Sequence, residues 1–274
     1  MTATSTDKVV VLARGLGTRM RRADESASLD DRQAAVAETG TKAMIPIDRP
    51  FLDYVLSAAA DAGYRRVCLI VGPEHETLRD YYGRQIQTQR LSIGFAVQPE
   101  PRGTADALLA AESFADGDPV LVINSDNYYP AGVLRTMRRQ AGSAVALFDQ
   151  QSMLSGGNVS EQRLRRFAVG QIDGRGRLRR ILEKPDEETL AGLPRPLWVS
   201  MNCWRFRPVI FDACRAIEPS PRGEWEIPCA VRHAIDVLGE PFAVVQAREA
   251  VLDLSSRQDV APVAAKLVGT RVEL

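Results

Sequence analysis

The stretch that decides the fold is KVVVLARGLGTRM, residues 8–20, in which a short apolar segment runs directly into a glycine-rich loop. Lys8–Leu12 (KVVVL) contains four consecutive aliphatic residues, which is typical of a strand covered on both faces. Gly15 and Gly17 allow the backbone behind this strand to approach an anion, whose charge free N–H groups and Arg19 can offset. We therefore expect a buried strand that ends at an anion-binding loop.

The loop matches neither of the two common phosphate-binding motifs. No Gly-Lys-Ser/Thr follows the glycines, as a P-loop requires, and the third glycine of the dinucleotide fingerprint G-x-G-x-x-G is replaced. Because a G-x-G loop is as often a structural turn, its interpretation depends on the rest of the chain.

Apolar segments alternate with amphipathic ones over the first 150 residues. This alternation predicts an α/β fold with a Rossmann-like, doubly wound, mostly parallel mixed sheet. The predicted strands are Lys8–Leu12, Arg66–Val71, Leu91–Gln98 and Val120–Ile123, and the predicted helices are Phe51–Ala62, Glu74–Gln87 and Thr104–Phe114, the last capped by Thr104.

The second part of the chain contains a hairpin signal. Asp173-Gly174-Arg175-Gly176 separates two strand-like segments and predicts a small antiparallel part. We expect one domain over residues 1–274, with halves 8–150 and 151–274. The expected strands are Phe167–Ile172, Leu178–Glu183, Trp198–Phe206 and Phe242–Ala247, and the expected helices are Pro208–Ile217, Ile227–Leu238 and one from Ser255 or Ser256 to about Leu267.

Composition excludes several classes of protein. The 274 residues carry 35 Lys+Arg and 35 Asp+Glu, and zero net charge argues against a general nucleic-acid or membrane-surface binder. No apolar run approaches the ~20 residues of a spanning helix, and Met1–Asp7 lacks the apolar core of a signal peptide. We expect a cytoplasmic protein that binds neither nucleic acid nor membrane, and a homo-oligomer is left open.

The cysteines and histidines suggest no metal site. Four cysteines without a C-x-x-C pair and two histidines give neither metal-ligand spacing nor a disulfide framework. We expect the cysteines to be small core residues. His75 is expected in solvent and His233 on a helix face, so the chemistry should use neither.

The glycine loop belongs to a longer series of motifs. Ala13–Met20 followed by Thr41–Ile47 (TKAMIPI) resembles the signature of the sugar-1-phosphate nucleotidyltransferases, a G-T-R loop and then P-K-x-[LM]-[LI]-P-[VI]. The resemblance extends in order over roughly residues 8–260. Its further matches are Gln98-Pro99, Gly103–Ala107 (GTADA), Asn124–Asn127 (NSDN), Glu183-Lys184-Pro185, Asn202, Gly223–Ile227 (GEWEI) and Leu252–Ser256 (LDLSS).

The resemblance implies the fold of the nucleotide-diphospho-sugar transferases and a specific reaction. A nucleoside triphosphate (NTP) and a sugar 1-phosphate would give an NDP-sugar and pyrophosphate by in-line displacement at the α-phosphate. The attacking phosphate is already an anion, so catalysis should consist of positioning and charge neutralisation rather than general-base chemistry. Residues 8–150 would bind the nucleotide and residues 151–274, with the antiparallel part, the sugar phosphate.

The same resemblance implies roles for the matching residues. Mg²⁺ would be the cofactor, because aspartate supplies the hard oxygen ligands that it prefers. Gln98 would offer its amide to a base edge, and Gly103 would leave room for the base. The implied catalytic residues are Arg19, Lys42 and Lys184; the nucleotide-binding residues are Leu12, Ala13, Gly15, Gly17, Thr18, Gln98, Gly103 and Thr104; the sugar-phosphate-binding residues are Asn127, Glu183, Lys184 and Asn202; and the metal ligands are Asp126 and Asp253.

Four features depart from the family pattern. Arg14 replaces the usual Ala or Gly and would lie near the base or ribose. Thr41 replaces a proline and Ser255 a glycine. The connection Arg21–Gly40 is longer than usual and has the pattern of a short amphipathic helix, which would be either a lid over the triphosphate or a surface insertion.

The substrates are less constrained than the class of reaction. Gln98 and the short chain favour dTTP or UTP with glucose 1-phosphate. The GTADA segment also fits mannose-1-phosphate guanylyltransferases and glucose-1-phosphate adenylyltransferases, so GTP and ATP stay open. A cytidylyltransferase acting on a non-sugar phosphate and a non-catalytic regulatory relative are also compatible with these motifs.

Overall fold

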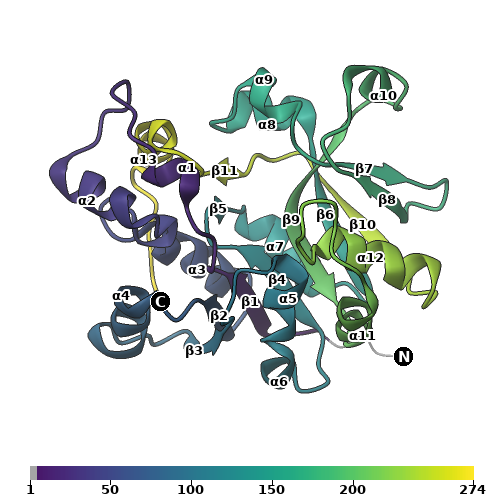
Figure 1. The fold of residues 1–274 in the computed structure, drawn as a ribbon, viewed down its shortest axis with the longest axis horizontal. Coiled ribbons are helices and arrows are strands. Elements are labelled where there is room, and N and C mark those ends of the chain that lie inside the picture. The colour runs from purple at the N-terminus through teal and green to yellow at the C-terminus, as the bar shows by residue number, and fades with distance from the viewer. Residues whose placement is uncertain (1–4) are drawn as a thin grey trace.

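A computed structural model describes residues 5–274; residues 1–4, part of the polar stretch Met1–Asp7, lie outside the described residues. A nine-stranded mixed sheet runs through the molecule in the order β10-β6-β9-β4-β1-β2-β3, and the hairpin β7–β8 is attached to β9 (Figure 1). The predicted α/β fold with a mostly parallel sheet is confirmed. Within residues 5–274, no helix is both long and apolar enough to cross a bilayer.

The main sheet consists of two parallel groups joined by an antiparallel strand. Strands β1 to β4 are parallel to one another, β6 is parallel to β10, and β9 lies antiparallel between β4 and β6. A second sheet pairs β5 with β11. The strands are β1 (Lys8–Leu12), β2 (Arg66–Val71), β3 (Ser92–Val97), β4 (Val120–Asn124), β5 (Asn127–Tyr128), β6 (Ser143–Asp149), β7 (Val169–Ile172), β8 (Leu178–Leu182), β9 (Trp198–Phe206), β10 (Phe242–Ala247) and β11 (Leu252–Asp253).

Strand β1 is buried on both faces, which explains its uninterrupted aliphatic sequence. Val9 and Val11 belong to a core cluster that includes buried side chains of α3 and α7, whereas Val10 belongs to the opposite cluster with α5, α11 and α12. All three valines are fully inaccessible to solvent. The β1 sequence therefore holds the two helical layers of the fold together.

Helices cover both faces of the sheet (Figure 1). Three short turns accompany them: Lys42–Met44, Tyr81–Gln85 and Arg257–Asp259, the last capped by Ser256 as predicted. The helices are α1 (Thr18–Arg21), α2 (Asp31–Thr39), α3 (Phe51–Asp61), α4 (Glu76–Asp80), α5 (Thr104–Leu109), α6 (Glu112–Ala115), α7 (Ala131–Arg138), α8 (Gln150–Gly156), α9 (Glu161–Leu164), α10 (Glu187–Ala191), α11 (Val209–Ala216), α12 (Ile227–Asp236) and α13 (Val260–Leu267).

Two of the predicted helices are interrupted. The segment Glu74–Gln87 forms only α4 and the π-helical turn Tyr81–Gln85, whose two tyrosines turn inward to donate hydrogen bonds to Asp53. The segment Thr104–Phe114 is divided into α5 and α6. Between them the N–H of Ala111 bonds the carbonyl of Leu108, a three-residue spacing that tightens the chain and ends α5.

The structure corrects the expected cap of α5 and the expected exposure of His75, and it shows which cysteines are buried. Gly103, not Thr104, precedes α5 as its cap, and the Thr104 hydroxyl instead accepts a hydrogen bond from Ile227 N at 2.9 Å. His75 is buried rather than solvated, because its Nδ1 accepts a bond from Gly72 N at 3.0 Å. Of the four free cysteines, Cys68, Cys203 and Cys214 are buried, while Cys229 is half-buried.

The parallel pairing of β1 with β4 positions the candidate site. Because neighbouring parallel strands end at the same edge of a sheet, the loop after Leu12 and the turn after Asn124 emerge side by side. Ser125 N donates to Leu12 O at 3.1 Å across this edge. The glycine loop and the NSDN segment, more than a hundred residues apart in sequence, are thereby brought together.

The buried Asp53 generates a prediction about stability. Burial raises its pKa, although the hydrogen bonds from Tyr82 and Tyr81 favour the charged carboxylate. A carboxyl with a raised pKa in the folded state destabilises the protein as pH rises through that pKa. We expect Asp53→Asn to unfold at a higher urea concentration than the wild type at pH 7, with the difference shrinking toward pH 4. A lower urea midpoint for the variant at pH 7 would contradict this.

Candidate active site

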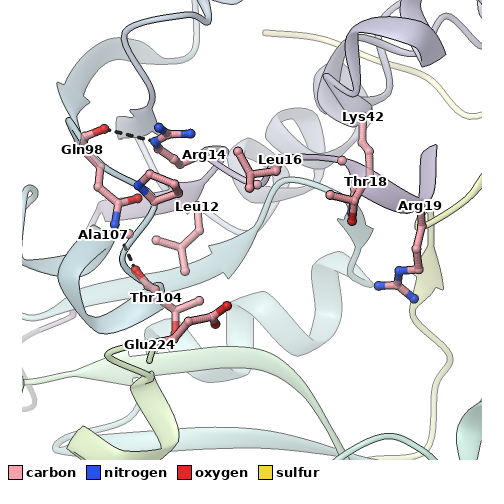
Figure 2. Close-up of a pocket in the computed structure, with 14 residues that line it drawn as sticks. Leu12, Arg14, Leu16, Thr18, Arg19, Lys42, Gln98, Thr104, Ala107 and Glu224 are labelled. Carbon is pink, nitrogen blue, oxygen red and sulfur yellow. Dashed lines mark hydrogen bonds between the residues drawn. The ribbon is translucent and has the colours of Figure 1, made fainter. Parts of the chain in front are cut away.

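The glycine loop forms one wall of a pocket of about 410 Å³ (Figure 2). Most of the residues predicted to bind nucleotide meet there, although they come from separate loops. The lining residues that were predicted are Leu12, Gly15, Gly17, Thr18, Arg19, Lys42, Gln98, Gly103 and Thr104, and the others are Arg14, Leu16, Pro101, Ala107 and Glu224. The segment TKAMIPI and the glycine loop therefore face a common space, as the resemblance implies.

A backbone contact fixes the shape of the glycine loop. Gly17 has φ of 61°, and a Cβ built on it would lie 2.0 Å from the carbonyl oxygen of Gly40. Gly40 in turn ends α2, with φ of 75°. Only glycine allows the two chains to approach this closely at these angles. The long connection 21–40 is thus packed directly against the loop.

The connection 21–40 contains the predicted short helix, α2, and contacts the end of the chain. Gln258 Nε2 donates to Ser26 Oγ at 2.9 Å, and Arg257 Nε donates to the carbonyl of Met20, just before the connection, at 3.0 Å. Figure 1 shows α13 beside α1, in agreement with these contacts. The proposed function of this connection as a lid over the triphosphate stays a prediction.

Two basic side chains of the site differ in their partners. Arg19 is exposed and makes no hydrogen bond or ion pair with any described residue. Lys42 Nζ lies 2.5 Å from Asp126 Oδ2. A smaller cavity of about 180 Å³ includes Ala13, Lys42 and Asp126 and shares Leu12 and Gly15 with the main pocket.

Asp126 and Asp253 come together through the small sheet. Strand β11 places Asp253 opposite Asn127, and Leu254 N donates to Asp126 O at 2.8 Å. Burial raises the pKa of Asp253, the negative charge of Asp126 raises it further, and Arg163 lowers it. The two carboxylates are therefore close enough to repel each other.

Sequence reasoning missed Arg163, the main partner of Asp253. Its guanidinium bridges Asp253 and Asp259, with 2.5 Å between Nη1 and Asp259 Oδ1. Asp253 is only 5% exposed and also accepts hydrogen bonds from Ser255 Oγ. No motif marks Arg163, because it reaches Asp253 across 90 residues of sequence.

The structure corrects the role expected for Asn127. Its side chain is 3% exposed, donates to Asp253 Oδ1 at 2.9 Å and accepts from Asn124 Nδ2 at 3.1 Å. Since both ends of its amide are used inside the protein, Asn127 holds Asp253 in place rather than contacting a sugar phosphate.

The amide of Gln98 is only partly available to a ligand. Its Nε2 donates to Gly103 O at 3.0 Å and to Asp106 Oδ2 at 2.7 Å. Both neighbours only accept hydrogen bonds, which fixes the orientation of the amide and leaves Oε1 as its remaining polar atom. The expectation that Gln98 offers both a donor and an acceptor to a base is therefore wrong for the donor.

Gly103 is required by a backbone contact as well as by the pocket. Its φ is 120°, and an added Cβ would lie 2.4 Å from the carbonyl oxygen of Trp225. Ala105 N donates to that same oxygen at 2.8 Å, and Trp225 N donates to Arg102 O at 2.8 Å. The GEWEI segment is thereby bound to the nucleotide half, and it brings Glu224 into the pocket.

The predicted sugar-phosphate residues do not line either cavity of the glycine loop. Lys184 and Asn202 both have left-handed backbones, with φ of 42° and 53°. Such residues cost about 1–3 kcal/mol and cluster at functional sites. Asn202 lies in an irregularity of β9, where Met201 and Asn202 are extra residues opposite Ala146–Leu147.

Neither Lys184 nor Asn202 uses its side chain internally. Within residues 5–274 neither side chain makes a hydrogen bond or an ion pair. Burial and the nearby Glu226 raise the pKa of Glu183, while Arg222 and Lys184 lower it. A strained and unengaged lysine next to a carboxylate has the character of a binding site, and Asn202 shares the strained backbone and the unengaged side chain.

The chemistry of Asp126 and Asp253 suits a hard divalent cation. In the described part of the chain, no three His, Cys, Asp or Glu side chains form a ready-made metal cluster. Mg²⁺ needs no such cluster, because it is usually held by one or two carboxylates together with waters and substrate phosphates. Asp126 lines a cavity, whereas Asp253 would exchange a contact with Arg163 to become a ligand.

A comparison with known protein families identifies the family of this chain. The sequence model of the nucleotidyl transferase family matches residues 33–254. The chain belongs to this family. The match begins after the glycine loop, so the loop of this nucleotidyl transferase is an independent point of resemblance.

Two curated relatives of this nucleotidyl transferase are named as glucose-1-phosphate nucleotidyltransferases. It is 29% identical over 235 residues to the UTP–glucose-1-phosphate uridylyltransferase AglF of Haloferax volcanii, covering 84% of this chain and 83% of that protein. It is 32% identical over 234 residues to a glucose-1-phosphate thymidylyltransferase of Streptomyces antibioticus, covering 84% of this chain and 57% of the longer relative.

The fold is also similar to that of a solved structure. A crystal structure of UDP-glucose pyrophosphorylase complexed with UDP-glucose has a TM-score of 0.74, with 20% identity, and the alignment covers 97% of this chain and 100% of the other. At this identity the likeness concerns the fold alone.

The two loop glycines of this nucleotidyl transferase provide a matched pair of variants. In Gly17→Ala the new Cβ meets Gly40 O and the left-handed backbone is strained, so we expect a Tm several degrees lower. In Gly15→Ala the Cβ meets no atom within 4 Å, so the Tm should be unchanged while nucleotide affinity falls, because Gly15 lines the pocket. Thermal unfolding measures the Tm of each variant, and nucleotide titration measures its affinity. Equal Tm values for the two variants would refute the close contact assigned to Gly17.

Proposed function

We propose that this nucleotidyl transferase joins an NTP to a sugar 1-phosphate, releasing pyrophosphate and an NDP-sugar. The preferred substrates are dTTP or UTP with glucose 1-phosphate. Relatives named as glucose-1-phosphate uridylyl- and thymidylyltransferases support this choice. Residues 8–150 would bind the nucleotide and residues 151–274 the sugar phosphate.

One observation carries the proposal: Lys42 and Asp126 form an ion pair beside the glycine loop, next to the exposed Arg19. The pocket and the smaller cavity beside it offer the glycine-loop backbone, the cations Arg19 and Lys42 and the carboxylate of Asp126, which are the kinds of group needed to hold a triphosphate and a metal ion. A phosphate entering this space would attract Lys42 away from Asp126 and free that carboxylate.

The chain's own residues would act by positioning and neutralisation. Arg19 and Lys42 would bind the triphosphate oxygens and stabilise the charge that develops as pyrophosphate leaves. Lys184 would hold the sugar 1-phosphate in line, and Glu183 and Asn202 would hydrogen-bond sugar hydroxyls. No histidine takes part, since the attacking oxygen carries its own negative charge.

Mg²⁺ fits this site as a cofactor held by Asp126 and Asp253. When bound, it would neutralise phosphate charge and polarise the phosphoryl oxygens. Asn127 and Ser255 would keep Asp253 oriented through their hydrogen bonds. Arg163 balances the charge of Asp253 through its ion pair.

The decisive experiment is a pyrophosphate-release assay. UTP, dTTP, GTP, ATP and CTP are each combined with a panel of sugar 1-phosphates and with phosphocholine, in the presence of Mg²⁺. Release that requires glucose 1-phosphate with UTP or dTTP supports the proposal. Release with mannose 1-phosphate and GTP would indicate a guanylyltransferase, and release with ATP an adenylyltransferase. Release only with phosphocholine would reject a sugar substrate, and nucleotide binding without any release would favour a non-catalytic regulatory protein.

The carboxylate of Asp126 is predicted to be essential. Asp126→Asn should lower kcat at least about 100-fold, because it removes a charged metal ligand of the transferring phosphates. Tm should fall by no more than a few degrees, because the variant loses the ion pair with Lys42 but Asp126 is partly exposed. The control is Asp118→Asn, which removes an exposed carboxylate that pairs with Lys8. Near-normal turnover of Asp126→Asn would refute the metal assignment.

The role of Lys184 is tested by separating the two substrates. Lys184→Ala should raise the KM for the sugar 1-phosphate about tenfold or more and leave nucleotide affinity within about twofold, because a single charge-assisted contact is removed. Lys184→Arg keeps the charge and should lie between the two. Equal loss of affinity for both substrates would contradict this assignment.

A further inference from the structure

Arg14 is the residue at which this chain departs most clearly from the family pattern, and it is part of the main pocket. The residue is 7% exposed. Its Nε donates to the backbone carbonyl of Gln98 at 3.1 Å, and its Nη1 lies 2.6 Å from Glu74 Oε1. A buried arginine held at two points has a defined position, unlike a solvated surface arginine.

The remaining polar atoms of this wall can be counted. A guanidinium has donors on three nitrogens and no acceptor, and Arg14 Nη2 bonds no atom of the described chain. The Gln98 amide donates its N–H groups to Gly103 and Asp106, which leaves Oε1, an acceptor, as its only polar atom without a partner. Figure 2 shows Arg14 and Gln98 on the same side of the pocket. The side chains of Arg14 and Gln98 therefore present a donor atom without a partner, Nη2, and an acceptor atom without a partner, Oε1.

We propose that Arg14 is a specificity-determining residue that, together with Gln98, selects nucleobases having a ring N–H beside a carbonyl. Gln98 Oε1 accepts from the ring N–H, and Arg14 Nη2 donates to the neighbouring carbonyl oxygen. Uracil, thymine and guanine present this edge; cytosine and adenine present an amino group beside an unprotonated ring nitrogen. The inference rests on the proposed function, because it assigns the base pocket of the same site.

Rejection of cytosine and adenine follows from position. To satisfy the same two atoms, either base would have to reverse the direction of its edge along the wall, so that its amino group faced Gln98 and its ring nitrogen faced Arg14. The triphosphate, held at the glycine loop, opposes that reversal. In the original orientation the amino group would face a guanidinium that cannot accept a hydrogen bond, and the unprotonated ring nitrogen would face Gln98 Oε1, which cannot donate one.

Glu74 would act as a positioning residue. Its carboxylate holds Nη1 on the side of the guanidinium away from Gln98 and so fixes the plane of the group. Lysine offers a single point charge without this fork, so Arg14→Lys would not reproduce the geometry.

A purely structural role for Arg14 makes a different prediction. Since Nε bonds the carbonyl of Gln98 just beyond β3, loss of Arg14 would then disturb the pocket for every nucleotide equally. The ratio of affinities for two bases separates the two roles, because a general disturbance cancels in the ratio.

The test is equilibrium binding of UTP and CTP by titration calorimetry, without sugar phosphate. It compares the wild type with Arg14→Met, Arg14→Lys and Arg102→Met. Arg102 is the matched control: it is an arginine beside Gly103 that pairs with the exposed Glu100 and does not line the pocket. Tm values show whether each variant is folded.

We expect the wild type and Arg102→Met to bind UTP about tenfold or more tightly than CTP, which is the size of one charge-assisted hydrogen bond. Arg14→Met should weaken UTP and reduce the ratio to about threefold or less, and Arg14→Lys should lie between. An unchanged ratio in Arg14→Met, or no preference in the wild type, overturns the inference. If the wild type binds no NTP at all, the proposed function fails with it.

Discussion

The pairing of β1 with β4 is the constraint on which the rest of the structure depends. Both strands are apolar on both faces, so they can exist only inside the sheet, and their parallel alignment brings the glycine loop next to the turn of Asp126. The edge so formed is where open α/β sheets bind ligands. Lys42, from the turn Lys42–Met44, reaches the same edge and forms an ion pair with Asp126.

Close backbone contacts keep this edge in shape. Gly17 against Gly40 joins the loop to the connection 21–40, and Gly103 against Trp225 joins the first half of the chain to the second. At both places the neighbouring main chain occupies the space that a side chain would need. The contact of Gly103 with Trp225 thus fixes the proposed nucleotide half against the proposed sugar-phosphate half, and only glycine fits there.

The buried charges of the site are paired, and the pairing has consequences for chemistry. Asp253 is neutralised by Arg163, and Asp126 by Lys42, so neither carboxylate is left alone in a low-dielectric region. Breaking the pair of the buried Asp253 with Arg163 is costly unless a new charge replaces the lost one. In the proposed function, a divalent cation would replace the charge of Arg163 at Asp253, and a triphosphate would replace that of Asp126 at Lys42.

The sequence by itself determined the α/β class, most strands and the order of motifs, because hydrophobic periodicity and glycine-rich turns are local properties. The motifs of the family resemblance also identified most of the residues that line the pocket, but implied no role for Leu16, Pro101 or Ala107. Only the tertiary structure decided that Arg163 holds Asp253, that Asn127 is internal, that Gln98 keeps only an acceptor, and that β5 pairs with β11. Contacts such as that between Asn127 and Asp253, which join residues more than a hundred positions apart, leave no periodic signal. They exist only once the sheet has brought the strand ends together.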